Sequence, residues 1–169
     1  VPFYIYYSMF GFQRVWDFIW AAGDMRARGF LLGGTAGRTT LNGEGLQHQD
    51  GHSHLAAAAT PNIKAYDLAY AYEIAVVIKH GIKEMFYDQK DVIYYLTLEN
   101  ENYVHPKMPE KIEEDIIKGM YKIRTTKNPT IRLLGSGPLL NEVIAAADLL
   151  KDEWGIDPGI WNVTSFTEL

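Results

Sequence analysis

The sequence predicts an α/β protein in which parallel sheets carry helices on their faces, in three-layer units. Apolar runs typical of strands alternate along the chain with helical segments, which is the pattern of β-α-β units. Residues 91–98 form an apolar, β-rich run without polar alternation, as expected of a parallel strand that is buried on both faces. Hydrophobic residues make up 47% of the 169-residue chain, so a substantial core is expected.

Strand and helix signals alternate through the first hundred residues. The expected elements, in chain order, are a strand at 3–7, a buried helix at 12–25, a strand at 29–32, a short helix at 54–59, a strand at 63–66, a helix from 67 to about 86, and a strand at 91–98. Aspartate is a residue type that caps helices, and apolar residues recur at one-face spacing after Asp67. We therefore expect Asp67 to cap the helix that follows it.

The composition changes at residues 100–118, where two prolines and an acidic run occur. We interpret this segment as a linker with one or two helical turns. A second α/β unit follows, with strands expected at 121–126, 130–134 and 160–164 and a helix at 138–153. This unit has too few strands to close a sheet, and the chain starts at Val1 directly in a strand-like run. Because complete proteins usually start and end with polar, poorly ordered residues, we expect an internal piece of a longer protein, incomplete at both ends.

Charge and composition exclude several classes of function. The formal net charge is -5, which argues against a nucleic-acid partner because such proteins favour a basic stripe. The absence of cysteine excludes a disulfide framework and a thiolate metal site, and it fits a cytoplasmic protein. The apolar runs are far too short to span a bilayer, so no membrane partner is expected.

The segment at residues 35–53 is polar, rich in glycine and longer than most connections, and loops of that size tend to be functional. Three of the five histidines, namely His48, His52 and His54, lie in its last residues and directly after it. A zinc site would need three or four ligands in a tetrahedral array, and this spacing is not a specific zinc signature. The alternative is acid-base or hydrogen-bonding work by His48, with Glu44 or Asp50 nearby. For His52 and His54 we favour a structural role, in which they hold the loop by bonding backbone carbonyls.

Two glycine-rich turns could bind an anion. Residues 33–38 could cradle one through backbone amides, but they lack the lysine of a P-loop, and we favour a tight turn. Residues 134–138 join a strand to a helix N-terminus, a place that suits phosphate, although such turns are common in α/β proteins.

The N-terminal aromatic run is the other feature with possible chemistry. It contains Tyr4, Tyr6, Tyr7, Phe10 and Phe12. Aromatic faces near a strand end can stack on a planar heterocycle, and core packing is the alternative. Strand alternation places Tyr4 and Tyr6 on one sheet face and Tyr7 on the other.

Taken together, these motifs closely resemble one enzyme family over essentially the whole chain. The matching runs are PFYIYYSMFGFQR at 2–14, AAGD at 21–24, ARGFL at 27–31, GGT at 33–35, GRTTLNGEGLQH at 37–48, DGHSH at 50–54, NENY at 100–103, LGSG at 134–137 and VTSFTEL at 163–169. They resemble the homodimeric bacterial type of pyruvate dehydrogenase, the decarboxylating component of its multienzyme complex. That family belongs to the wider transketolase-like superfamily.

The resemblance implies a fold, a reaction and partners. The family has three α/β domains, so residues 1–99 would form the second part of the pyrimidine-binding domain, 100–118 a linker, and 119–169 the first part of the C-terminal domain. The parent enzyme would decarboxylate pyruvate with thiamine diphosphate and Mg²⁺ and reductively acetylate the lipoyl group of an acetyltransferase component. The cofactor would lie between the two subunits of a cytoplasmic homodimer.

The resemblance also assigns roles to single residues. Phe10 matches the phenylalanine that stacks on the aminopyrimidine ring, and Tyr7 matches a neighbouring aromatic residue of that pocket. His48 matches the loop histidine that orients substrate or assists proton transfer, and Glu44 matches an acidic residue near the same cavity. The activating glutamate and the magnesium ligands of the family would lie outside this chain, so none of its residues is expected to bind the metal.

Alternatives stay open at this point. The isolated chain is expected to be inactive, and it could serve as a non-catalytic dimerisation or interaction module of the same fold. A relative that acts on another 2-oxo acid, or a transketolase-like enzyme that acts on a ketose, is the third possibility.

Overall fold

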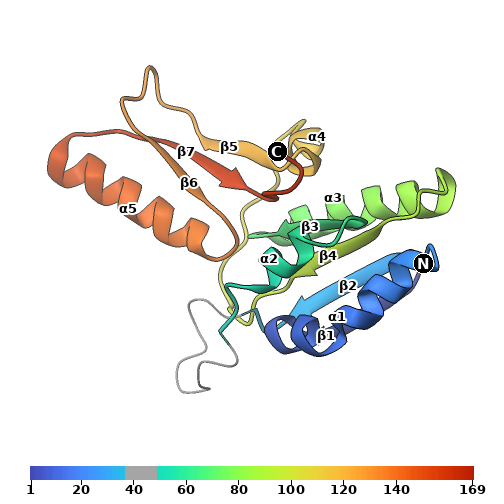
Figure 1. The fold of residues 1–169 in the computed structure, drawn as a ribbon. Helices are drawn as coiled ribbons and strands as arrows, with labels where there is room; N and C mark the ends of the chain where they lie inside the picture. Colours follow the sequence, from blue (N-terminus) through green and yellow to red (C-terminus); the bar gives the residue numbers. More distant parts are fainter. Residues whose placement is uncertain (37–48) are drawn as a thin grey trace.

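The computed structural model describes residues 1–36 and 49–169 and forms two sheets in these ranges (Figure 1). The first sheet consists of β1 (Phe3–Tyr7), β2 (Gly29–Gly34), β3 (Ile63–Asp67) and β4 (Ile93–Thr97). Its strand order is β1-β2-β4-β3, and every neighbouring pair is parallel. This is the parallel arrangement that the alternating sequence pattern predicts.

Helices cover both faces of the first sheet and give it three layers (Figure 1). On one face, α1 (Ser8–Asp24) and α2 (Ser53–Ala58) pack on side chains such as Ala65 and Tyr95. On the other face, α3 (Ala71–Ile82) continues into a π-helical turn, Lys83–Tyr87, and packs on residues of the opposite strand parity. Since side chains alternate across a strand, the apolar runs of β2 and β4 supply both cores.

The second sheet is smaller and mixed. It consists of β5 (Met120–Arg124), β6 (Arg132–Gly135) and β7 (Gly159–Val163), in the order β5-β7-β6. β6 and β7 are parallel, joined through α5 (Leu139–Trp154), whereas β5 and β7 are antiparallel. The expectation of parallel units therefore holds for the first sheet and for one of the two pairs in the second.

Most expected elements lie within a few residues of their observed positions. The short helix α4 (Glu113–Ile117) occupies the segment that was expected to be a linker with one or two helical turns. The expectation that Asp67 caps the next helix is wrong, because Asp67 is the last residue of β3 and α3 begins four residues later at Ala71.

The two sheets are joined along the free edge of β3. The backbone N–H of Asp67 donates to the Thr164 carbonyl at 2.8 Å, and the Ser165 hydroxyl donates to the Ala65 carbonyl at 2.6 Å. Unpaired strand edges attract other chains, and here residues from the C-terminal end of the same chain cover one. Figure 1 shows this C-terminal segment beside β3.

Candidate functional site

The carboxyl ends of the four parallel strands meet in one row. The strand register aligns Tyr6 with Gly33, Gly33 with Thr97, and Thr97 with Asp67. In open α/β sheets, ligands bind outside the carboxyl ends of the strands. Residues 35–52, which include His48 and His52, connect the carboxyl end of β2 to the start of α2, and this makes the edge the candidate site.

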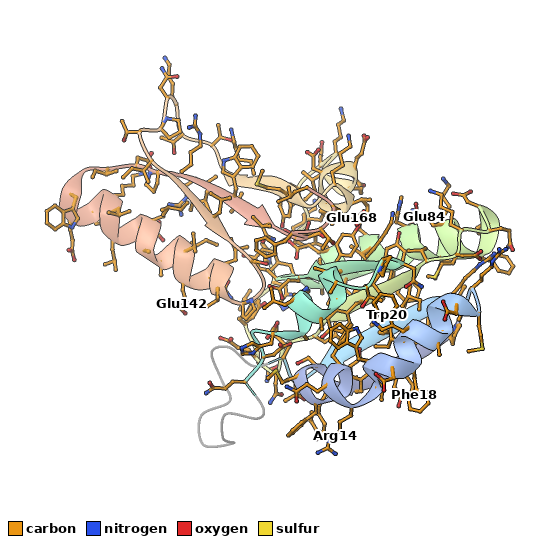
Figure 2. The ribbon with its side chains drawn as sticks, viewed as in Figure 1. Arg14, Phe18, Trp20, Glu84, Glu142 and Glu168 are labelled. Atoms are coloured by element: carbon orange, nitrogen blue, oxygen red, sulfur yellow. The ribbon has the colours of Figure 1, made fainter. Side chains whose placement is uncertain are left out.

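Tyr7 and Phe10, the two expected cofactor-binding residues, lie where β1 passes into α1. Tyr7 is 56% exposed, and Phe10 is half-buried with the Arg14 guanidinium 5.1 Å from its ring centroid. Arg14 projects from the outer side of α1 (Figure 2). Aromatic side chains near a strand end can stack on a flat ring.

The two expected catalytic residues, His48 and Glu44, lie outside the described residues. The structure describes the chain on either side of them. Asp50 is buried, and its carboxylate accepts hydrogen bonds from the backbone N–H groups of His52 and Ser53 and from the Ser53 hydroxyl, at 3.2, 3.0 and 2.5 Å. Asp50 therefore satisfies donors at the start of α2.

Gly33 is required by the close packing of this edge. A Cβ atom at Gly33 would lie 2.4 Å from the Tyr95 hydroxyl and 2.9 Å from Ser8 Cβ, distances at which some atom must move. The tight turn expected from residue 33 onward is not what the structure has at Gly33 and Gly34, which are the last residues of β2, and Thr35 follows them with a positive φ of 56°.

Three buried hydroxyls lie behind this glycine. The side chains of Tyr6, Ser8 and Tyr95 have no hydrogen-bond partner within the part of the chain that the structure describes. Burial, with Asp50 nearby, raises the pKa of both Tyr6 and Tyr95, so both hydroxyls stay neutral at physiological pH. Buried hydroxyls of this kind commonly hydrogen-bond ordered water.

His54 contacts a polar cluster that the sequence did not reveal. Its Nε2 lies 3.1 Å from Thr97 Oγ1 and 3.9 Å from Asp67 Oδ1. The Thr97 hydroxyl donates to Asp67 Oδ1 at 2.6 Å, and the Ser136 hydroxyl donates to Asp67 Oδ2 at 2.7 Å. The described partners of His54 Nε2 are therefore side chains from two strand ends, and the expectation that His54 bonds a backbone carbonyl stays a prediction.

Sequence reasoning missed Asp67, Thr97 and Ser136 as members of this cluster. The available signal was positional: Thr97 and Asp67 are the first polar side chains after buried runs in β4 and β3. Ser136 lies in the glycine-rich turn at 134–138, for which an anion was considered. The Ser136 hydroxyl donates to the Asp67 carboxylate.

A second polar cluster lies between the units. Glu73 of α3 is fully buried, and its carboxylate accepts hydrogen bonds from the backbone N–H groups of Ala69 and Tyr70, the Tyr121 hydroxyl and the Asn162 amide. Burial raises the pKa of Glu73, and these four donors act in the opposite direction. This carboxylate thus ties the start of α3 to β5 and β7.

The described residues offer no metal centre of their own. Within residues 1–36 and 49–169, no three His, Asp or Glu side chains gather in a group that could hold a metal ion. In the same ranges, no helix has the length and apolar character needed to cross a membrane.

Comparisons with known proteins point to one family. Residues 1–106 match the model of the "Pyruvate dehydrogenase E1 component middle domain". The pyruvate dehydrogenase E1 component of Cupriavidus necator is 61% identical over 173 residues, which cover 100% of this chain and 19% of that protein. The E1 component of Escherichia coli K12 is 56% identical over 172 residues, with the same coverage. The chain thus spans about a fifth of the length of these relatives.

Similar solved structures support the fold. Transketolase from Campylobacter jejuni covers 99% of this chain and 25% of its own length, with a TM-score of 0.79 and 18% identity. A split-gene transketolase, described as an inactive beta4 tetramer, covers 98% of this chain and 49% of its own, with a TM-score of 0.70 and 18% identity. At this identity, the likeness establishes the arrangement of strands and helices alone.

Proposed function

Because this chain belongs to the pyruvate dehydrogenase E1 family, we propose that it is the central part of an enzyme that decarboxylates pyruvate. The observation that carries this proposal is the 61% identity over the whole chain to one E1 component. We extend the proposal to the reductive acetylation of a lipoyl-bearing acetyltransferase, and to a cytoplasmic homodimer. Residues 1–99 would belong to the pyrimidine-binding domain, 100–118 to a linker and 119–169 to the C-terminal domain.

The carboxyl edge of the first sheet fits one wall of a thiamine diphosphate site. When bound, this cofactor supplies the nucleophilic carbon and the electron sink that decarboxylation of a 2-oxo acid needs. Tyr7, exposed at the end of β1, and Phe10, half-buried beside it, would hold the flat pyrimidine ring. His48 would orient the substrate or move a proton, with Glu44 near the same cavity. The Mg²⁺ ligands would come from outside this chain, and we expect the isolated chain to be inactive.

A chimera tests this proposal. Residues 1–169 would replace the matching segment of the Cupriavidus E1 component, and pyruvate-dependent reduction of an artificial electron acceptor would be measured with thiamine diphosphate and Mg²⁺. We expect turnover within about tenfold of the host enzyme, because the chimera would keep its catalytic groups. Loss of one acid–base group commonly lowers the rate by roughly 10²-fold or more. His48→Ala in the chimera should lower kcat by roughly 10²-fold or more while circular dichroism and light scattering stay unchanged.

The controls separate folding from chemistry. The host enzyme sets the reference rate, and Tyr87→Ala, at a residue that is 73% exposed on the π-helical turn, serves as the matched control for a substitution away from the edge. A folded, dimeric chimera that turns over no pyruvate would contradict the proposed function. That result would favour the non-catalytic dimerisation module, for which the exposed β1 residues Phe3, Tyr4 and Ile5 offer an apolar surface. Turnover of a different 2-oxo acid, or of a ketose, would support a related enzyme.

A further inference from the structure

Asp67 holds two hydrogen bonds from opposite sides at the carboxyl edge. It is only 4% exposed, its Oδ1 accepts from Thr97 in the neighbouring strand, and its Oδ2 accepts from Ser136 in the second unit. A buried carboxylate with a donor on each oxygen is held in one orientation. This places the carboxylate beside the His54 ring, with Oδ1 3.9 Å from Nε2.

The hydrogen bonds of Thr97 set the proton on His54. A threonine hydroxyl has one proton to donate, and at 2.6 Å that proton is directed at Asp67. Thr97 Oγ1 can then only accept from His54 Nε2, which lies 3.1 Å away. His54 Nε2 therefore carries a proton, and the nearby carboxylate favours the doubly protonated ring.

The turn that supplies Ser136 depends on two glycines. Gly137 has a φ of 53°, a region that favours glycine. A Cβ at Gly135 would lie 2.8 Å from Leu140 Cα in α5, so the turn packs directly on the helix. These two constraints fix the position from which Ser136 reaches Asp67.

We propose that Asp67 and Ser136 are positioning residues, which hold a protonated His54 at the ligand-binding edge, so that the second unit helps to build the site. The proposal rests on the function proposed above, because a positively charged imidazole at this edge would favour a small anionic substrate such as a 2-oxo acid. The chemistry is that of a carboxylate-supported histidine, in which the carboxylate acts through the Thr97 hydroxyl to fix the tautomer of the ring.

Other titratable groups around His54 are few in the described residues. Asp50 lies just before α2, the helix that contains His54, and its carboxylate accepts three hydrogen bonds. β4 contributes Tyr95, whose ring centroid is 5.4 Å from that of His54, and β1 contributes Tyr6, which stacks on Tyr95. Both tyrosines have raised pKa values and stay neutral, and Glu99 follows β4 in sequence. Within residues 1–36 and 49–169, the Asp67 carboxylate approaches the ring, with Oδ1 3.9 Å from Nε2.

Histidine C2 hydrogen–deuterium exchange, read by mass spectrometry in the chimera, tests the proposal directly. The rate of this exchange follows the protonation of each imidazole. We expect Asp67→Asn to move the exchange midpoint of His54 to lower pH by roughly one unit, because an adjacent opposite charge is removed. Tyr66→Phe is the matched control: it removes the hydrogen bond from Tyr66 to the Ile117 carbonyl, also between β3 and the second unit, and should leave the midpoint unchanged.

A double-mutant cycle tests the part played by Ser136. Ser136→Ala should lower kcat/KM for pyruvate several-fold in the wild-type background and cause no further loss when Asp67 is already Asn, since both changes act through one group. An unmoved His54 midpoint in Asp67→Asn would overturn the proposal, as would an undiminished effect of Ser136→Ala in that background. If Asp67→Asn does not fold, Asp67→Ser provides the same loss of charge. A chimera without pyruvate turnover refutes the proposed function, while the exchange measurement still decides the role of Asp67.

Discussion

Glu84 is a buried carboxylate surrounded by donors, at the amino ends of β3 and β4. Lys90 Nζ lies 2.6 Å from Oε1, while Lys64 Nζ and the Tyr94 hydroxyl lie 3.0 and 2.5 Å from Oε2. Lys64 also approaches Glu168 at 3.6 Å, and Figure 2 labels both glutamates. Burial acts to raise the pKa of Glu84, but the hydrogen bonds from Lys90, Tyr94 and Lys64 outweigh it and lower the pKa to about 2.

This lowered pKa predicts that part of the free energy of unfolding is lost as the pH falls. The unfolded chain has an ordinary glutamate pKa of about 4.3, so the contribution of Glu84 is complete above that pH and is lost as the pH falls toward 2. Glu84→Gln should lower the free energy of unfolding by roughly 1 to 3 kcal/mol at pH 7, and the difference from wild type should shrink as the pH falls through this window. Urea denaturation at several pH values measures it.

Glu114→Gln is the control for this prediction, because Glu114 pairs with Lys118 at 2.8 Å on the surface of α4. Exposed pairs contribute little, so its stability should follow wild type at every pH. A difference between Glu84→Gln and wild type that persists unchanged at low pH would show that packing, and not charge, explains the effect.

At the residue scale, the sequence shows no sign of the partners of His54, a residue for which it favours a structural role. The histidine spacing drew attention to His54, but nothing in the local sequence shows that Thr97 and Asp67 end neighbouring strands. That proximity comes from the strand order β1-β2-β4-β3, in which two strands distant in sequence lie side by side. A contact between strands that are distant in sequence leaves no pattern in the local sequence.

At the scale of elements, the start of α3 shows how a buried side chain replaces a local cap. The helix begins at Ala71, and two backbone N–H groups before it, those of Ala69 and Tyr70, donate to Glu73 Oε2 at 2.7 and 2.9 Å. Such donors otherwise have no partner within the helix. The same carboxylate also accepts from Tyr121 and Asn162 of the second sheet.

Glu73→Gln should therefore destabilise the protein although the two side chains have nearly the same shape. All four partners donate, and a glutamine would direct its own NH₂ group at two of them. We expect a loss of roughly 1.5 to 3 kcal/mol in the free energy of unfolding, measured as a lower denaturant midpoint at an unchanged m-value. Glu113→Gln, an exposed acid in the first turn of α4, should be neutral. Equal stabilities of Glu73→Gln and wild type would indicate that the carboxyl group is already protonated in the folded protein.

Elements with strong local patterns were predictable, and those defined by distant contacts were not. The aromatic run of β1 and the apolar run of β4 predicted their strands closely. The antiparallel pairing of β5 with β7 was missed, because strand direction depends on the path of the chain through the linker. The cap was assigned to Asp67, whose residue type fits, while the observed cap comes from Glu73 inside the helix.

At the scale of the whole molecule, the two units share one hydrophobic core. Ile116 and Tyr121 from the second part of the chain are fully buried in the same cluster as Tyr66, Leu96 and Val77 of the first. Tyr66 donates a hydrogen bond to the Ile117 carbonyl across this junction, and Tyr72 and Tyr121 share another between their hydroxyls. The two regions on either side of the proposed boundary near residue 99 therefore share one hydrophobic core.

This shared core predicts that residues 1–99 do not fold stably alone. Cutting the chain after residue 99 would expose Tyr66 and leave Glu73 buried at one side without Tyr121 and Asn162. Removing one partner of a buried polar group leaves the other with its full desolvation cost, roughly 1 to 3 kcal/mol for each group, and typical domains are stable by only about 5 to 15 kcal/mol.

The complete 169-residue chain should unfold in one transition, which circular dichroism and tyrosine fluorescence would monitor together. The 1–99 piece should show no cooperative transition, and adding residues 100–169 as a separate chain should restore one. A 1–99 piece with the melting temperature of the full chain would show that the shared core adds little, and that the units fold independently.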